Sequence, residues 1–399
     1  MLLGSIQTRS RAHASSDTFV LILNSLFGRS NYLAYTVVND LDNNIIIPKN
    51  VKGRGALLNT PNPFQTNVVE DFWDGSYFDE DFFGSDNTTQ FSEVHTKTIL
   101  NKVDSPDIPG GWSMNPYQGC EHGCTYCHAR ITHEYWGYSA GTDFEKNILI
   151  KKNAPALLKK ELKSRSWNGE TIVLSGNTDC YQPAEKTYGI TRELLQICLD
   201  HNQSVSIITK NALVCRDIDI LEQLAAKNLV HVHISITTLD EELRRAMEPR
   251  TSSAGNRLKT IQKLSEHNIP THVMLAPIIP GLNSDEIFGI CKAVSQAGAI
   301  SLGHSMVRLN GVIALLFEDW IQATFPLKAS RVMHLIAEAQ GGKLSNSKFG
   351  ERMTGVGVLA ESINQQVRLA KRKYNLTAKP KPLKTPNYKT DTTAQLYLF

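Results

Sequence analysis

The sequence has no apolar run long enough to cross a membrane. Its one such stretch near the start, "FVLILNSLFG" from Phe19, is well short of the roughly 20 apolar residues that a membrane helix needs. The same stretch lacks the small-residue cleavage site of a secretory signal. We therefore expect a cytoplasmic protein with no membrane partner, although the basic, Ser-rich "TRSRAHASS" before this stretch is also typical of a transit peptide.

The chain also lacks a strong net charge, because 42 Lys and Arg residues against 39 Asp and Glu residues give only +3. Any surface that binds a polyanion must therefore be local. Seven cysteines are an odd number, and without a secretory signal they favour a reducing compartment and free thiols over a disulfide framework. With 41% hydrophobic and 20% charged residues, the 399-residue chain has the composition of a globular protein of one large or two ordinary domains.

From about residue 144, apolar strands alternate with amphipathic helices. The predicted strands are "FEKNILIK", "ETIVLSG", "QSVSIITK", "LVHVHISIT" and "THVMLAPIIPG". This alternation predicts an α/β fold with a parallel sheet covered by helices, in five or six repeats, too few for a complete eight-stranded barrel. Polar residues follow the strands, as in "SGNTD" and "TKN", so we expect the functional site at the carboxyl ends of the strands.

Composition and periodicity divide the chain into five parts. These are an unassigned N-terminal extension, an N-terminal arm, the core, a C-terminal helical segment and a Pro- and Lys-rich flexible tail, at residues 1–50, 51–105, 106–345, 346–376 and 377–399. Within the arm, "EDFWDGSYFDEDFFGSD" from Glu70 alternates aromatic and acidic residues. It fits a loop held on the domain surface by its aromatic rings, or a strip that binds a partner.

Three cysteines lie close together in "NPYQGCEHGCTYCHAR", namely Cys120, Cys124 and Cys127. Three thiolates with His122, His128 or His133 would complete a zinc site, although zinc folds usually present two separated cysteine pairs. A four-iron cluster also takes thiolate ligands, and three of them would leave its fourth iron open. Gly119 and Gly123 would let the loop wrap closely around such a cluster. The spacing favours an iron–sulfur cluster and leaves zinc as the alternative.

Within this loop, "CEHGCTYC" resembles the CxxxCxΦC motif of the radical S-adenosylmethionine (SAM) superfamily, with Tyr126 as the aromatic residue. Further segments resemble the spore-photoproduct-lyase-like branch, whose members are often labelled DNA repair photolyases. These segments are "HEYWGYSAGTDFEKNI", "SGNTDCYQPAE", "IITKN", "MEPRT" and "APIIPGLNSDEI". The resemblance covers roughly residues 50–375. It implies a partial (β/α)6 TIM-type radical SAM barrel, in agreement with the repeats counted above.

The resemblance implies roles for the residues that match these motifs. The three cysteines would ligate a [4Fe–4S] cluster whose open iron binds SAM, and one electron would cleave SAM to a 5′-deoxyadenosyl radical. An electron donor such as flavodoxin or ferredoxin is implied as well. The residues expected to bind SAM are Thr178, Asp179, Lys210, Ser235 and Arg250.

Each strand-end residue also has an ordinary structural interpretation. Lys210 fits a solvated lysine, and Ser235 fits a helix cap. Arg250 would otherwise pair with Glu248 or with a helix carbonyl.

The sequence departs from the branch at two positions. His128 follows the third cysteine where close relatives commonly have tyrosine; it fits a packing replacement better than a role near the cluster. Gly176 stands where spore photoproduct lyase has its hydrogen-donating cysteine. Cys180 lies a few residues later, and it is the candidate catalytic residue, as a displaced hydrogen donor, or else it packs in the core. Thymine-dimer reversal therefore does not follow from the resemblance.

The last residues, "QLYLF" from Gln395 to Phe399, resemble the peptide by which bacterial replication and repair proteins bind the sliding clamp. A flexible basic linker ending in a glutamine and hydrophobic anchors suits such a groove, and it would concentrate the protein at DNA. Folding of this end back onto the core is the alternative. The cations of "KRKYNLTAKPKPLK" would attract phosphate weakly, or simply be solvated.

Three hypotheses of function follow. The first is a radical SAM enzyme that acts on DNA or on another nucleic-acid-associated substrate, for example in DNA repair as a lyase. The second is radical modification of RNA or of a peptide. The third belongs to another class: a non-catalytic, clamp-associated DNA-binding protein with a structural metal.

Overall fold

A seven-stranded sheet forms the centre of the fold, in the order β10-β9-β8-β7-β6-β3-β2. The six strands from β3 to β10 are parallel, and β2 pairs with β3 in the antiparallel direction. This confirms the predicted α/β fold with a partial (β/α)6 barrel. The strands are β2 (Leu100–Lys102), β3 (Trp112–Met114), β6 (Ile172–Leu174), β7 (Val205–Thr209), β8 (Val230–Ser235), β9 (Thr271–Ile278) and β10 (Ser301–Met306).

The computed structural model describes residues 53–64, 88–105, 107 and 111–384. The predictions for residues 1–50, for the acidic and aromatic segment from Glu70, and for the clamp-like peptide at Gln395–Phe399 lie outside this part of the chain. No helix in the described part is long and apolar enough to span a membrane.

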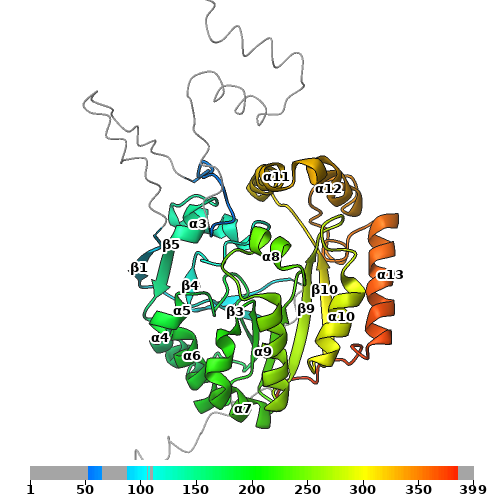
Figure 1. The fold of residues 1–399 in the computed structure, drawn as a ribbon. Helices are drawn as coiled ribbons and strands as arrows, with labels where there is room; N and C mark the ends of the chain where they lie inside the picture. Colours follow the sequence, from blue (N-terminus) through cyan, green and yellow to red (C-terminus); the bar gives the residue numbers. More distant parts are fainter. Residues whose placement is uncertain (1–52, 65–87, 106, 108–110, 385–399) are drawn as a thin grey trace, which may run out of the picture. The chain divides into compact units, whose positions relative to one another are not determined.

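Helices cover the outer face of the sheet (Figure 1). They do so because one face of each is apolar: in the main hydrophobic core, Leu221 of α7 and Leu264 of α9 pack with Val232 of β8. The covering helices are α4 (Ala154–Leu162), α6 (Ile190–Asp200), α7 (Ile218–Ala226), α9 (Ala254–Glu266), α10 (Ile287–Gln296) and α13 (Val358–Lys373).

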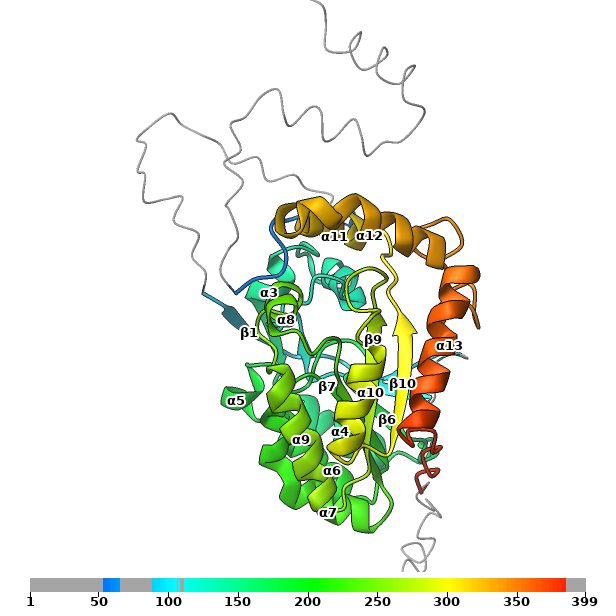
Figure 2. The ribbon, with the colours of Figure 1, turned by 45° about the vertical axis from the view of Figure 1, so that its right-hand side comes forward.

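The remaining elements surround the carboxyl ends of the barrel strands. A small second sheet has the order β1-β5-β4. Helices α11 and α12 lie beyond the ends toward which β9 and β10 point (Figure 2). These elements are β1 (Gln90–Val94), β4 (Tyr117–Gln118), η2 (His128–Trp136), α3 (Asp143–Lys146), β5 (Asn147–Lys151), α5 (Glu185–Tyr188), η3 (Ala212–Asp217), α8 (Glu241–Met247), α11 (Val312–Thr324) and α12 (Pro326–Ala339).

The structure corrects two details of the predicted organisation. The strand predicted at "FEKNILIK" is α3 followed by β5, and β5 belongs to the small sheet, so the first barrel strand is β3 instead. The tail expected to be flexible from residue 377 is bonded to the barrel as far as Lys384, whose backbone N–H donates to the Asn228 carbonyl at 3.0 Å.

Candidate functional site

The three cysteines lie in the loop between β4 and η2. Cys120 and Cys124 are buried, with 6% and 7% exposed, and Cys127 is half-buried. Gly119 and Gly123 turn this loop with φ angles of +79° and +66°. A Cβ at Gly119 would come within 2.8 Å of the Asn147 carbonyl oxygen. The loop therefore needs glycine at this position both for its backbone conformation and for its close approach to β5.

The cysteine loop rests on the carboxyl ends of three neighbouring strands. The His122 Nδ1 lies 3.3 Å from the Asp179 carboxylate beyond β6, and its Nε2 lies 3.3 Å from the Asn211 amide beyond β7. The Tyr126 hydroxyl lies 3.3 Å from that of Thr237, beyond β8. Because parallel strands end at one edge, the loop covers the place where the sequence predicts the functional site.

A buried arginine that was not predicted from the sequence, Arg130, holds the cysteine loop through a hydrogen bond to its backbone. The Arg130 side chain is fully buried, and its Nε donates to the Cys124 carbonyl at 3.0 Å. Its guanidinium also pairs with Glu145, whose other contacts are the backbone N–H groups of Gly55 and Ala56 at 2.9 and 2.8 Å. The only signal in the sequence was a charged residue three positions after the last motif cysteine.

The tyrosine of the cysteine motif, Tyr126, also anchors the cysteine loop to the rest of the protein. The Tyr126 hydroxyl donates to Glu248, a fully buried carboxylate that also pairs with Arg257. Burial alone would raise the pKa of Glu248, but Arg257, Lys210 and two hydroxyl donors lower it to about 2. Glu248 is therefore a permanently charged centre that ties the cysteine loop to the segment after α8.

The donor groups fit an iron–sulfur cluster better than a single zinc ion. In the part of the chain that the structure describes, no group of three or more His, Cys, Asp or Glu side chains is arranged to hold one ion. His133 packs against the rings of Tyr138 and Phe144, and His128 is exposed. A cluster requires a wider spacing, since each thiolate binds a different iron. Burial raises the pKa of the Cys120 and Cys124 thiols, so bound metal would be needed to hold them as thiolates.

Thr178 and Asp179 lie at the end of β6, as predicted, but both side chains already have protein partners. The buried Thr178 hydroxyl donates to the Tyr117 carbonyl at 2.9 Å. The Asp179 carboxylate accepts from the Thr209 hydroxyl at 2.7 Å and from the Lys210 backbone N–H at 2.8 Å. In this structure Asp179 thus joins the ends of β6 and β7 to His122.

Lys210 and Ser235 come together at the next two strand ends. The Lys210 ammonium lies 5.9 Å from the centre of the Tyr126 ring, so it faces the cysteine loop instead of solvent. Burial would lower the pKa of Lys210, but Cys124 and Glu248 raise it overall. Ser235 is 3% exposed, and the residues that cap α8 and α9 are Asp240 and Ser253. The helix-cap interpretation of Ser235 is therefore wrong.

Arg250 contacts the cysteine loop directly. Its Nη1 lies 3.1 Å from Glu121 Oε1, and its backbone N–H donates to the His122 carbonyl at 3.3 Å. The structural alternative gave Arg250 either Glu248 or a helix carbonyl as its partner, and Glu248 pairs instead with Arg257. The Arg250 side chain remains 35% exposed, so it is accessible to a ligand beside the loop.

Cys180 directly follows Asp179, and its backbone N–H donates to the Ser175 hydroxyl at 2.7 Å just after β6. Its side chain is fully buried in the main core, among residues such as Tyr181 and Leu194. The packing interpretation is thus the one that the structure favours. Gly176, by contrast, is exposed at the end of β6. The side chain of His128 is also exposed to solvent, and its charged neighbours are Arg308 and Lys210.

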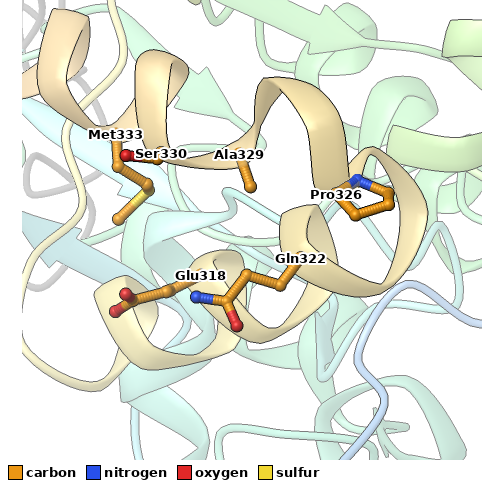
Figure 3. A pocket seen from close by; sticks show the side chains of 6 residues that line it. All are labelled: Glu318, Gln322, Pro326, Ala329, Ser330 and Met333. Atoms are coloured by element: carbon orange, nitrogen blue, oxygen red, sulfur yellow. The ribbon is translucent and has the colours of Figure 1, made fainter.

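A surface hollow of about 510 Å³ lies between α11 and α12 and is separate from this site. Figure 3 shows Glu318 and Gln322 on one helix facing Ala329, Ser330 and Met333 on the other. None of the residues predicted from the sequence lines it. The chemistry-bearing residues gather instead around the cysteine loop.

Comparison with known proteins gives three findings. The model of the Radical SAM superfamily matches residues 114–294. An uncharacterized protein of Mycobacterium tuberculosis is 34% identical over 251 residues, which are 61% of this chain and 73% of that protein. An uncharacterized protein of Methanocaldococcus jannaschii is 30% identical over 182 residues, which are 45% of this chain and 65% of that protein.

Among solved structures, spore photoproduct lyase complexed with dinucleoside spore photoproduct aligns with a TM-score of 0.54 and 14% identity. The alignment covers 71% of this chain and 79% of that one. A mutant of the same lyase with bound AdoMet and dinucleoside spore photoproduct gives a TM-score of 0.53 at 14% identity, with the same coverage. At this identity the likeness establishes a shared fold.

Proposed function

This chain belongs to the radical SAM superfamily, and from that premise we propose that it binds a [4Fe–4S] cluster on Cys120, Cys124 and Cys127 and cleaves SAM to act on a nucleic-acid substrate. One observation carries the proposal. Three cysteines with no disulfide partners lie in a single loop, which is turned by glycine residues. Buried ion pairs hold this loop over the ends of β6, β7 and β8.

When bound, the cluster and SAM would supply a 5′-deoxyadenosyl radical. The residues of this chain would hold the reactants and keep water out. Lys210, Ser235 and Arg250 are the proposed SAM contacts, since Lys210 and Arg250 lie against the cysteine loop and Ser235 is the last residue of β8. Asp179 and Thr178 remain predicted SAM contacts, but their present hydrogen bonds indicate that they shape the strand ends around the ligand.

A nucleic-acid substrate is supported by an arginine near His128 of the loop. Arg308 follows β10, and the described residues provide it with no hydrogen bond or ion pair. Burial and the neighbouring Arg352 lower the pKa of Arg308, and the nearby Asp107 carboxylate offsets this only in part, so a further anion there would be stabilising. His128 and Lys210 lie close by. A phosphate of a nucleic acid fits this cationic edge, and the structural neighbour with the same fold was solved with a dinucleoside.

The lyase reaction predicted through Cys180 has no support in the geometry. The Cys180 thiol is fully buried in the main core, although its backbone N–H donates to the Ser175 hydroxyl just after β6. We therefore propose radical chemistry on a nucleic-acid-associated substrate without assigning the hydrogen donor to Cys180. An electron donor such as flavodoxin or ferredoxin, and a sliding clamp bound by Gln395–Phe399, complete the proposed set of partners.

Metal and sulfide analysis tests the proposal. The anaerobically reconstituted protein should contain about four iron and four sulfide per chain. Cys124→Ala should lose the cluster. Cys215→Ala changes a partly buried cysteine outside the loop and should keep the cluster. One zinc and no sulfide in the wild type would contradict the proposal and support the structural-metal alternative.

A further inference from the structure

A second cavity lies at the opposite end of the barrel from the cysteine loop. Its volume is about 360 Å³, and it opens beside the starts of β9 and β10, next to α13. Figure 2 shows α13 alongside β10 and α10. The lining residues are His233, His272, Val273, Met274, Ser301, Leu302, Gly303, Lys371, Thr377, Ala378, Lys379 and Pro380.

The C-terminal strap, residues 376–384, forms one wall of this cavity. The Leu302 backbone N–H donates to the Leu376 carbonyl at 3.3 Å, and Thr377 forms a β-bridge with Ser301. Farther along, the Asn228 side chain donates to the Pro382 carbonyl at 2.9 Å. Backbone hydrogen bonds at both ends therefore hold the strap across the amino-terminal end of the barrel.

One of the histidines that line this cavity, His272, carries a buried polar atom without a partner in the described residues. His272 is 3% exposed, and its Nδ1 lies 2.8 Å from the Ser301 hydroxyl oxygen. When that hydroxyl donates to Nδ1, the proton of the neutral ring is on Nε2. The Nε2 atom is buried and has no hydrogen-bond partner within the described residues. A buried N–H donor without an acceptor is costly unless a ligand or water supplies one.

The charges around the cavity are of one sign. The lining contains the ammonium groups of Lys371 and Lys379 and two histidines, but no aspartate or glutamate. Lys371 forms no ion pair within the described part of the chain. Burial lowers the pKa of Lys371, so desolvation of its charge is not offset in the free protein. An anion in the cavity would offset it.

We propose that this cavity is a binding site for a phosphate group, held by the His272 Nε2–H and the ammonium groups of Lys371 and Lys379. A phosphate group has enough acceptor oxygens to bind all three donors at once. Met274, Leu302 and Pro380 provide apolar walls for the organic part of a phosphate ester. The phosphate comes either from a small ester such as a mononucleotide or from the backbone of a nucleic acid.

Calorimetric titration of the full-length, cluster-loaded protein tests the site. The probes are inorganic phosphate, AMP and a short single-stranded oligonucleotide. We expect binding of at least one probe, weakened about tenfold or more by His272→Gln and by Lys371→Gln/Lys379→Gln, in line with the loss of charged hydrogen bonds. Binding of AMP alone identifies a small-ester site, whereas tighter, salt-dependent binding of the oligonucleotide identifies a backbone site.

The matched control is Lys328→Gln/Lys343→Gln, which removes two exposed lysines elsewhere and should leave the affinity unchanged. The lysine pair at the cavity is partly exposed, so this variant should fold even where His272→Gln does not, and circular dichroism checks both. No binding of any probe to the wild type would overturn the proposal. Equal binding by the wild type and the cavity lysine variant would overturn it as well.

Discussion

At the scale of single residues, buried charges hold the cysteine loop in place. Glu248 joins Tyr126 of the loop to Arg257 of α9, and Glu145 joins Arg130 to the segment at Gly55. In each case the carboxylate and the guanidinium are almost fully removed from water. A buried ion pair stabilises a protein little more than well-packed apolar residues in its place would. Removal of one partner alone is strongly destabilising, because it leaves the other charge buried and unpaired.

Replacement of Arg257 tests this view. Arg257→Leu leaves Glu248 buried without its cation, and we expect a loss of about 3–5 kcal/mol in the free energy of unfolding. Urea denaturation measures it. Arg368→Leu, which removes an exposed ion pair with Glu361, should change the stability by at most about 1 kcal/mol. Similar effects of the two substitutions would show that the buried pair does not hold the loop.

Lys210 provides a test of the proposed SAM site. Its ammonium faces the cysteine loop, and we expect Lys210→Gln to weaken SAM binding by about tenfold or more, since a charged hydrogen bond is lost. The iron content should stay unchanged. Lys227→Gln, an exposed lysine beyond α7, is the control. Unaltered SAM affinity in Lys210→Gln would remove this residue from the site.

Arg308 provides a test of the proposed nucleic-acid contact. Arg308→Gln should weaken oligonucleotide binding and reduce the slope of log affinity against log salt by about one. SAM binding should not change, because Arg308 is proposed to contact the substrate only. If the salt dependence of binding is the same in Arg308→Gln and the wild type, the cationic edge has been wrongly assigned.

At the scale of elements, two central strands carry histidines that stay neutral in the folded protein: His233 is half-buried and His272 is buried. Burial, together with the charges of neighbouring histidines, lowers the pKa of His233 on β8 to about 3 and that of His272 on β9 to about 4. In the unfolded chain both would titrate near 6.5. Below about pH 6.5 the unfolded state therefore binds more protons than the folded state does. The contribution of these histidines to the free energy of unfolding is fully present above that pH.

This difference predicts a loss of stability in acid. As the pH falls from about 6.5 toward 4, each histidine should remove up to about 1.4 kcal/mol per pH unit. His233→Gln should show a shallower pH dependence of the unfolding midpoint than the wild type does. Parallel pH profiles for the two proteins would mean that His233 does not remain neutral in the folded state.

The elements also show what sequence alone can predict. The strands β6, β7, β8 and β9 were predictable because their apolar runs end in polar residues. Strand β3 has only three residues, and β10, "SLGHSM", mixes glycine, serine and histidine, so neither gives an apolar signal. The motif cysteines were identified by spacing. Arg130 and Glu145 were missed, because their pairing depends on a contact between separate segments that no local pattern records.

At the scale of the whole molecule, the chain leaves the barrel at the end opposite to the cysteine loop. The strap ends at Lys384, beside the start of β8, whereas the cysteine loop covers the carboxyl ends of the strands. Residues 385–399 reach at most about 50 Å when extended. In the sequence, the proposed clamp peptide Gln395–Phe399 follows this strap.

Deletion of Gln395–Phe399 tests this arrangement. We expect the loss of binding to purified sliding clamp, with iron content and SAM binding unchanged, because the strap before Lys384 is retained. Surface plasmon resonance with immobilised clamp measures the first effect. If the variant without Gln395–Phe399 binds the clamp as well as the wild type does, the main argument that the protein acts at DNA is lost.

The central claim is that the cysteine loop supports reductive cleavage of SAM. Its most direct test is the amount of 5′-deoxyadenosine formed when the anaerobically reconstituted protein is incubated with SAM and dithionite. We predict 5′-deoxyadenosine from the wild type and from Cys215→Ala, and none above background from Cys124→Ala. The same background level in all three proteins would contradict the account.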